Sequence, residues 1–189
     1  MSQTRFTNTD VGRRFLTVSN LLSIFRGLLV VPFSMVMLSG IASGRHWGAA
    51  IMVVAALTDN MDGWFARRLH QTSEWGKILD PLADKIAVGS VAVILLLLDS
   101  IPPWFVILLL MRDILILTGG IFVRARYGAV LPAIGIGKWT VGIVAATLFM
   151  MVLGIQSLLA DCLIAASSIL ALVSFGFYAQ RFLEVVRPT

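Results

Sequence analysis

The chain has 189 residues, of which 58% are hydrophobic and 13% charged, with a mean hydropathy of +0.92 and a formal charge of +5. This composition excludes a soluble globular enzyme and indicates one membrane domain. In a membrane protein, positive charge bears on orientation and on anionic lipid rather than on nucleic acid. The single cysteine, Cys162, excludes an internal disulfide framework and argues against a zinc site.

Residues 1–16 are polar and basic, and we assign them to a juxtamembrane segment ahead of a membrane domain at 17–183. Arg13 and Arg14 stand beside Val11 and Phe15, which fits an amphipathic helix lying on the membrane surface. A solvated basic leader explains the same residues equally well. Because this stretch is polar, we expect no cleavable signal peptide.

Six apolar spans follow, so we expect an all-α integral membrane protein with six transmembrane helices. The spans lie at about 17–42, 46–68, 76–98, 102–124, 135–155 and 158–182. Pro102 and Pro103 predict the beginning of the fourth helix, and Asp161 is a candidate N-cap of the last one.

Basic residues are distributed unevenly between the two sides of the membrane that these spans define. Arg45 lies alone on one side, while Arg26 and Arg112 lie inside spans. Twelve others share the side of the N-terminus: Arg5, Arg13, Arg14, Arg67, Arg68, Lys77, Lys85, Arg124, Arg126, Lys138, Arg181 and Arg187. Because basic residues accumulate on the cytoplasmic side, this asymmetry predicts cytoplasmic termini.

The second span ends in a group of small and acidic residues. Asp59, Asp62, Gly63 and Ala66 fall within roughly 100° of arc on one helix face, since a helix turns about 100° per residue. Ionisable groups at membrane depth are costly, and they therefore mark a functional site. The short polar segment 69–75 suits a turn into the third span.

The third span begins with Gly76, Asp80 and Asp84, which share one face at a spacing of four. If the two helices are antiparallel neighbours, two carboxylates from each converge on one pocket. Four carboxylates repel one another unless cations neutralise them, and oxygen ligands favour hard divalent ions such as Mg²⁺ or Mn²⁺. The charge suits two ions, the arrangement that clamps both oxygens of a phosphoryl displacement. The pocket is therefore predicted to be a cytoplasmic two-metal site.

The motif resembles the signature of the CDP-alcohol phosphatidyltransferase family at all eight fixed positions. It reads Asp59-x2-Asp62-Gly63-x2-Ala66-Arg67-x8-Gly76-x3-Asp80-x3-Asp84. The run 79–85 and the compact length most resemble the phosphatidylglycerophosphate synthases of that family.

The resemblance implies a phospholipid-synthesising enzyme that transfers a phosphatidyl group from CDP-diacylglycerol to a small alcohol and releases CMP. Asp59, Asp62 and Asp80 would hold metal on the diphosphate, and Asp84 would share a second ion and act as the general base. The CDP headgroup would rest on the small residues of the motif, Gly63, Ala66 and Gly76. The same resemblance implies glycerol 3-phosphate as the acceptor. We also expect a homodimer.

Further polar residues are candidates for binding the nucleotide or a phosphate. Arg67 can pair with a phosphate. The segment 19–26 partly resembles Pro-Asn-x-Leu-Thr-x-x-Arg, a segment found in family members, so Asn20 and Arg26 would line the CDP pocket. A cap residue and a snorkelling arginine are the structural alternatives for these two positions.

Four basic residues are candidates for binding a phosphorylated acceptor: Arg112, Arg124, Arg126 and Lys138. Arg112 and Asp113 are consecutive and point about 100° apart, so we expect that they do not face one small site directly. A structural ion pair is the alternative for Arg112, and ordinary cytoplasmic charge is the alternative for the other three.

Several other readings stay open at this stage. The signature does not encode the acceptor, so inositol phosphate, serine or another alcohol competes with glycerol 3-phosphate. An ion transporter using intramembrane aspartates would leave the Asp-Gly-x-x-Ala-Arg block unexplained. An aspartate-rich intramembrane prenyltransferase is a further alternative, but its relatives usually have more helices than this chain can supply and a different spacing.

Overall fold

The computed structural model describes residues 18–69, 76–128 and 135–186; the side chains it describes begin at Leu21 and exclude residues 60–69 and 76–81. All elements in these ranges are α-helices. They are α2 (Val18–Leu28), α3 (Val30–Leu38), α4 (Gly44–Leu69), α5 (Gly76–Leu97), α6 (Pro103–Tyr127), α7 (Gly135–Val152) and α8 (Leu158–Val186). The all-α prediction is therefore confirmed for the described residues.

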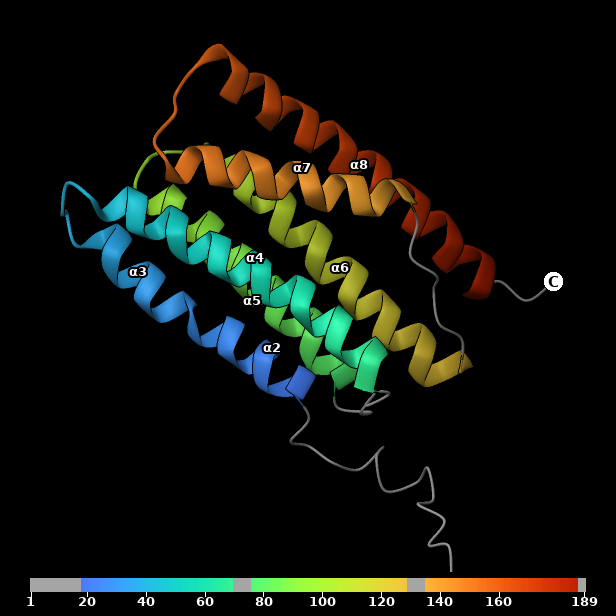
Figure 1. Cartoon of the computed structure of the whole chain (residues 1–189). Coiled ribbons are helices and arrows are strands. Elements are labelled where there is room, and N and C mark those ends of the chain that lie inside the picture. Colours follow the sequence, from blue (N-terminus) through green and yellow to red (C-terminus); the bar gives the residue numbers. More distant parts are fainter. Residues whose placement is uncertain (1–17, 70–75, 129–134, 187–189) are drawn as a thin grey trace, which may run out of the picture. The chain divides into compact units, whose positions relative to one another are not determined.

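The chain divides into two compact units, Met1–Val91 and Ala92–Thr189, with the boundary inside α5. In the first unit, α2 and α3 run in line along α4 (Figure 1). The two short helices replace the single first helix that the hydropathy predicts. Pro32 has no N–H to donate to the carbonyl of Leu28, so the helix is interrupted beside that position, at Leu29.

Two glycines allow α3 and α4 to approach closely near the turn that joins them. A Cβ atom on Gly44 would lie 2.5 Å from the carbonyl oxygen of Val36, and one on Gly48 would lie 2.6 Å from Sδ of Met37. Small residues four apart are a common means of bringing two membrane helices together. These positions therefore fix how α4, which carries the first half of the aspartate motif, packs on α3.

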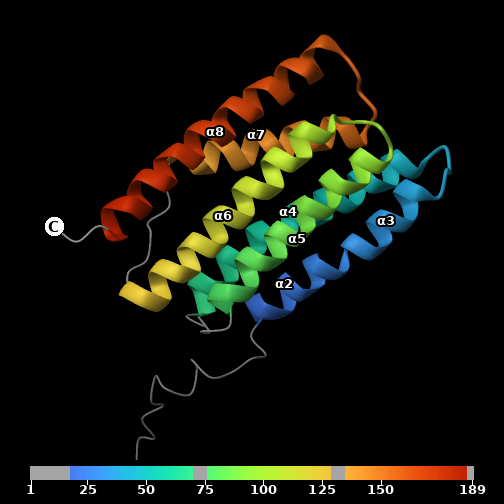
Figure 2. The same ribbon diagram turned by 180° about the vertical axis from the view of Figure 1, so that it is seen from behind.

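In the second unit, α8 packs against both α6 and α7, as the reverse view also shows (Figure 2). Buried hydroxyl groups connect α7 to α8: Oγ1 of Thr147 and Oγ of Ser167 are 2.8 Å apart, and Thr140 donates to the carbonyl of Leu170 at 3.3 Å. Interhelical hydrogen bonds of this kind stabilise helix pairs where lipid removes the hydrophobic driving force.

Four helical stretches are long and apolar enough to cross a membrane: Leu21–Leu38, Pro103–Tyr127, Gly135–Val152 and Leu158–Val186. Large apolar side chains on them are exposed, such as Met35 at 69% and Leu158 at 80%. Outward-facing apolar residues are expected where lipid is the solvent, and the chain is an integral membrane protein. The count of six transmembrane helices stays a prediction.

The helix ends test two local predictions. α6 begins at Pro103, with Pro102 as its N-cap, as expected. The Asp161 prediction is wrong: α8 begins at Leu158, so Asp161 lies within its first turn. There its negative charge still interacts favourably with the helix dipole.

Candidate active site

Arg26 of α2 joins the first and last aspartates of the motif. Its Nη1 atom lies 2.7 Å from Oδ1 of Asp59 in α4 and also forms an ion pair and hydrogen bond with Oδ1 of Asp84 in α5. The arginine side chain is 5% exposed, whereas the two carboxylates are 56% and 46% exposed. A buried cation therefore holds two carboxylates that remain accessible from outside the protein.

Local packing explains why these three side chains meet. Ser23 and Arg26, one helical turn apart, are both buried on the same face of α2. On α4, Thr58 is buried next to Asp59 and donates to the carbonyl of Val54 at 2.6 Å, so its hydroxyl is satisfied within its own helix. The position before Asp84 is the small, buried Ala83. The neighbouring side chains are small, or have a hydroxyl that is already hydrogen-bonded within its own helix. They therefore leave the charged groups free to converge.

The remaining motif residues lie in α4 and α5, but their side chains are outside the described part of the structure. These are Asp62, Gly63, Ala66, Arg67, Gly76 and Asp80; the side chain of Asn20 in α2 is outside it as well. Among the described residues, no group of three or more His, Cys, Asp or Glu side chains gathers. The predicted roles of these residues stay predictions.

The residues that are described fit a divalent cation. Oδ1 of Asp59 and Oδ1 of Asp84 approach one common nitrogen, so they can also approach one common ion. Both donors are carboxylate oxygens, which Mg²⁺ and Mn²⁺ prefer. One arginine cannot neutralise four aspartates, and the motif keeps a net negative charge that attracts cations.

From the sequence, Arg26 was predicted to contact the nucleotide, and its pairing with the motif was not predicted. One signal was present in the sequence. Arg26 is a lone basic residue inside the first span, and charged residues within membranes pair with one another. The alternative of a snorkelling arginine does not describe this side chain, because its guanidinium is directed to carboxylates of neighbouring helices.

A second polar cluster lies within the second unit, around Arg112. This arginine is 7% exposed; its Nη1 lies 2.6 Å from Oδ1 of Asp113, and its Nη2 donates to Oγ of Ser174 in α8 at 2.9 Å. Its Nε has no partner among the described residues. A Cβ atom on Gly137 would lie 3.5 Å from the hydroxyl of Tyr178 and 3.8 Å from Oγ of Ser174, so α7 also borders this cluster.

The neighbouring pair Arg112 and Asp113 interacts directly, although their helical positions point apart. The long arginine side chain bridges the offset of about 100° between consecutive residues. The other acceptor candidates are exposed at helix ends: Arg124 and Arg126 in the last turns of α6, and Lys138 in the first turn of α7. Ser174 and Tyr178 were not predicted, because their proximity to Arg112 and Gly137 depends on tertiary packing.

A family model described as CDP-alcohol phosphatidyltransferase matches residues 16–178. A Mycobacterium tuberculosis protein named "Putative cardiolipin synthase" is 39% identical over 125 residues, covering 66% of this chain and 59% of the relative.

Two further relatives carry the name CDP-diacylglycerol–glycerol-3-phosphate 3-phosphatidyltransferase. The Bacillus subtilis protein is 36% identical over 122 residues, covering 62% of this chain and 63% of its own length. The Aquifex aeolicus protein is 33% identical over 180 residues, covering 90% of this chain and 98% of its own length. The matches thus span less than two thirds of the Mycobacterium and Bacillus proteins but nearly all of the Aquifex one.

Proposed function

Because the chain belongs to the CDP-alcohol phosphatidyltransferase family, we propose that it transfers a phosphatidyl group from CDP-diacylglycerol to glycerol 3-phosphate and releases CMP. The observation that carries the proposal is the ion-paired arrangement of Arg26 with Asp59 and Asp84. It brings the two ends of the family motif to one point within the first unit of the structure. A phosphoryl-transfer site needs such convergence, because its catalysis rests on positioning and charge stabilisation.

In this proposal the residues of the motif divide into three tasks. Asp59, Asp62, Asp80 and Asp84 would hold two Mg²⁺ or Mn²⁺ ions, which would offset the charge of the diphosphate. Gly63, Ala66 and Gly76 would leave room for the CDP headgroup, and Arg67 and Asn20 would contact it. Arg26 would keep the carboxylates in position.

Asp84 would accept the proton of the attacking hydroxyl. Its side chain is 46% exposed, so an acceptor can approach it, and Arg26 holds one of its oxygens. A general base needs both properties: access to the proton that it removes and a defined orientation. The pairing with Arg26 supports this role for Asp84, because an ion pair restricts rotation of the carboxylate.

The acceptor is proposed from the names of the relatives and from the basic residues of the second unit. Arg112, Lys138, Arg124 and Arg126 would bind the phosphate of glycerol 3-phosphate. The relative named cardiolipin synthase favours a second candidate, a lipid alcohol such as phosphatidylglycerol. Both candidates use the same donor chemistry and differ only in the attacking hydroxyl.

The deciding experiment measures CMP release from labelled CDP-diacylglycerol by the purified protein. Glycerol 3-phosphate, phosphatidylglycerol, inositol phosphate and serine are supplied separately, with Asp59→Asn as the inactive control. We expect release with glycerol 3-phosphate, loss of turnover after chelation, and recovery with Mg²⁺ or Mn²⁺. Release with another acceptor alone would correct the substrate; full turnover in excess chelator would refute the metal sites.

We further propose that the termini and the active site lie on the cytoplasmic side, which the uneven distribution of basic residues supports, and that two copies of the chain form a homodimer. Single cysteines introduced at Glu74 and at Ser43, in a Cys162→Ser background, should show opposite accessibility to an impermeant thiol reagent in intact cells. Equal labelling from outside at both positions would contradict this orientation.

A further inference from the structure

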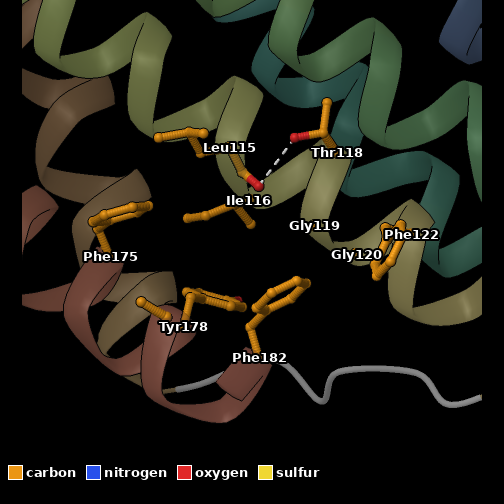
Figure 3. Close-up of a pocket in the computed structure, with 10 residues that line it drawn as sticks. Leu115, Ile116, Thr118, Gly119, Gly120, Phe122, Phe175, Tyr178 and Phe182 are labelled. Atoms are coloured by element: carbon orange, nitrogen blue, oxygen red, sulfur yellow. Dashed lines mark hydrogen bonds between the residues drawn. The ribbon is translucent and has the colours of Figure 1, made fainter. Parts of the chain in front are cut away.

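An apolar groove of about 380 Å³ lies between α6 and α8 in the second unit. Its floor includes Gly119 and Gly120 of α6, and aromatic rings line it from α8, including Phe175 and Phe182 (Figure 3). Thr118 also borders it, but this hydroxyl donates to the carbonyl of Ile114 at 2.7 Å. The hydroxyl is therefore satisfied within α6 and leaves the groove largely apolar.

Contacts between the two helices show which of their ends meet. Arg112 bonds to Ser174, 62 positions later, and the rings of Phe122 and Phe182, 60 positions apart, have centroids 6.1 Å apart. Two contacts with nearly the same offset mean that α6 and α8 run parallel. The C-terminal ends of both helices therefore lie at the same end of the groove.

That end of the groove is positively charged. Arg126 follows Phe122 by about one turn on the same face of α6, and Arg181 directly precedes Phe182 on α8. Glu184 is the acidic residue of the last turns of α8, so the arginines outnumber it. An apolar groove that ends in a basic cluster matches a molecule with a hydrocarbon chain and an anionic head.

We propose that the α6–α8 groove binds one acyl chain of an anionic phospholipid, whose phosphate contacts Arg126 and Arg181. Both helices are long and apolar enough to span the membrane, so the molecules surrounding them are lipids rather than water. Basic clusters between membrane helices attract anionic headgroups. The groove and Arg181 have no part in the proposed reaction, whereas Arg126 is also a candidate for the acceptor phosphate; the variants tested below therefore change only Arg181 and the groove.

The test uses native mass spectrometry of the delipidated full-length protein in mixed micelles. Phosphatidylglycerol and phosphatidylcholine with identical acyl chains serve as the two probes. We expect one phosphatidylglycerol to bind more tightly than phosphatidylcholine, and Arg181→Gln to weaken it about fivefold. Equal affinities for the two lipids, unchanged by Arg181→Gln, would show that the groove does not select anionic lipid and would overturn the proposal.

A groove-filling variant locates the bound chain. A Cβ atom on Gly120 would meet nothing within 4 Å, so Gly120→Leu can place its side chain in the groove. Displacing about two methylene groups should weaken lipid binding about tenfold. Gly142→Leu on α7 is the matched control, because it is equally open and does not line the groove.

Two further outcomes of the same spectra would refute the assignment. Unchanged lipid binding in Gly120→Leu would place the lipid elsewhere on the protein. A dimer that dissociates in Gly120→Leu but not in Gly142→Leu would show that a second copy, rather than a lipid, occupies the groove. CMP release is not a readout in this test, so its result is separate from the fate of the proposed reaction.

Discussion

Replacing Arg26 by Met should reveal that it stabilises the motif carboxylates and does not only contact the substrate. A charge-assisted hydrogen bond contributes about 1.5–3 kcal/mol when sheltered, and an exposed ion pair about 0–1 kcal/mol. Arg26 is 5% exposed and Asp59 is 56% exposed, so the pair lies between these limits. We therefore expect an interaction energy of about 1 kcal/mol between Arg26 and Asp59 in the protein without substrate.

A double-mutant cycle measures this energy from melting temperatures of the metal-free protein. Arg26→Met and Asp59→Asn should be non-additive by about 2–4 °C, the shift that 1 kcal/mol produces in a chain of this size. Arg26→Met with Ser39→Ala is the control pair, because α2 and α3 run in line (Figure 1) and a rise of about 1.5 Å per residue separates the two positions by about 20 Å. Additive effects in the Asp59 cycle would refute the structural role, and leave Arg26 as a substrate contact alone.

The other predictions concern the base, the helix packing and the acceptor. Asp84→Asn should retain CDP-diacylglycerol binding in a filter assay while CMP release falls by about 10²–10⁴-fold; near-normal turnover would mean that another group is the base. Gly44→Ala should lower the melting temperature more than Gly48→Ala, because its Cβ meets a backbone carbonyl at 2.5 Å rather than a flexible methionine; equal shifts would contradict this packing. Lys138→Ala and Arg112→Ala should raise the KM for glycerol 3-phosphate while donor KM stays unchanged, and an unchanged acceptor KM in both would remove the residue-level support for a phosphorylated acceptor.

Hydropathy was sufficient to predict the helices, because a segment of about 20 apolar residues in a bilayer can satisfy its backbone only as a helix. Each predicted span corresponds to helical structure, and Pro103 begins α6 as expected. The helix bounds differ from the prediction at two places. Pro32 interrupts the first helix at Leu29, and α8 begins one turn before the expected cap.

The partners of the buried arginines could not be predicted, because they depend on how helices pack together. Helical periodicity placed Asp59 and Asp84 on the faces of their own helices, but it contains no information about which side of α2 meets them. Arg26 is separated from Asp84 by 58 positions, and Arg112 from Ser174 by 62. From the sequence we could expect only that charged residues inside a membrane pair with other polar groups.

The two buried arginines differ in how far neighbouring carboxylates account for their burial. Arg26 is paired with two carboxylates of neighbouring helices, which together carry more negative charge than it neutralises. Arg112 is paired with a single carboxylate, that of Asp113 on its own helix, and with an uncharged serine. Nε of each arginine is buried without a partner among the described residues. A buried N–H without an acceptor costs about 1–3 kcal/mol, and apolar residues of similar volume often replace buried ion pairs without loss. Helix packing alone therefore gives little reason for an arginine at position 112, whereas a phosphate ligand would supply the missing acceptor and offset the cost of its burial.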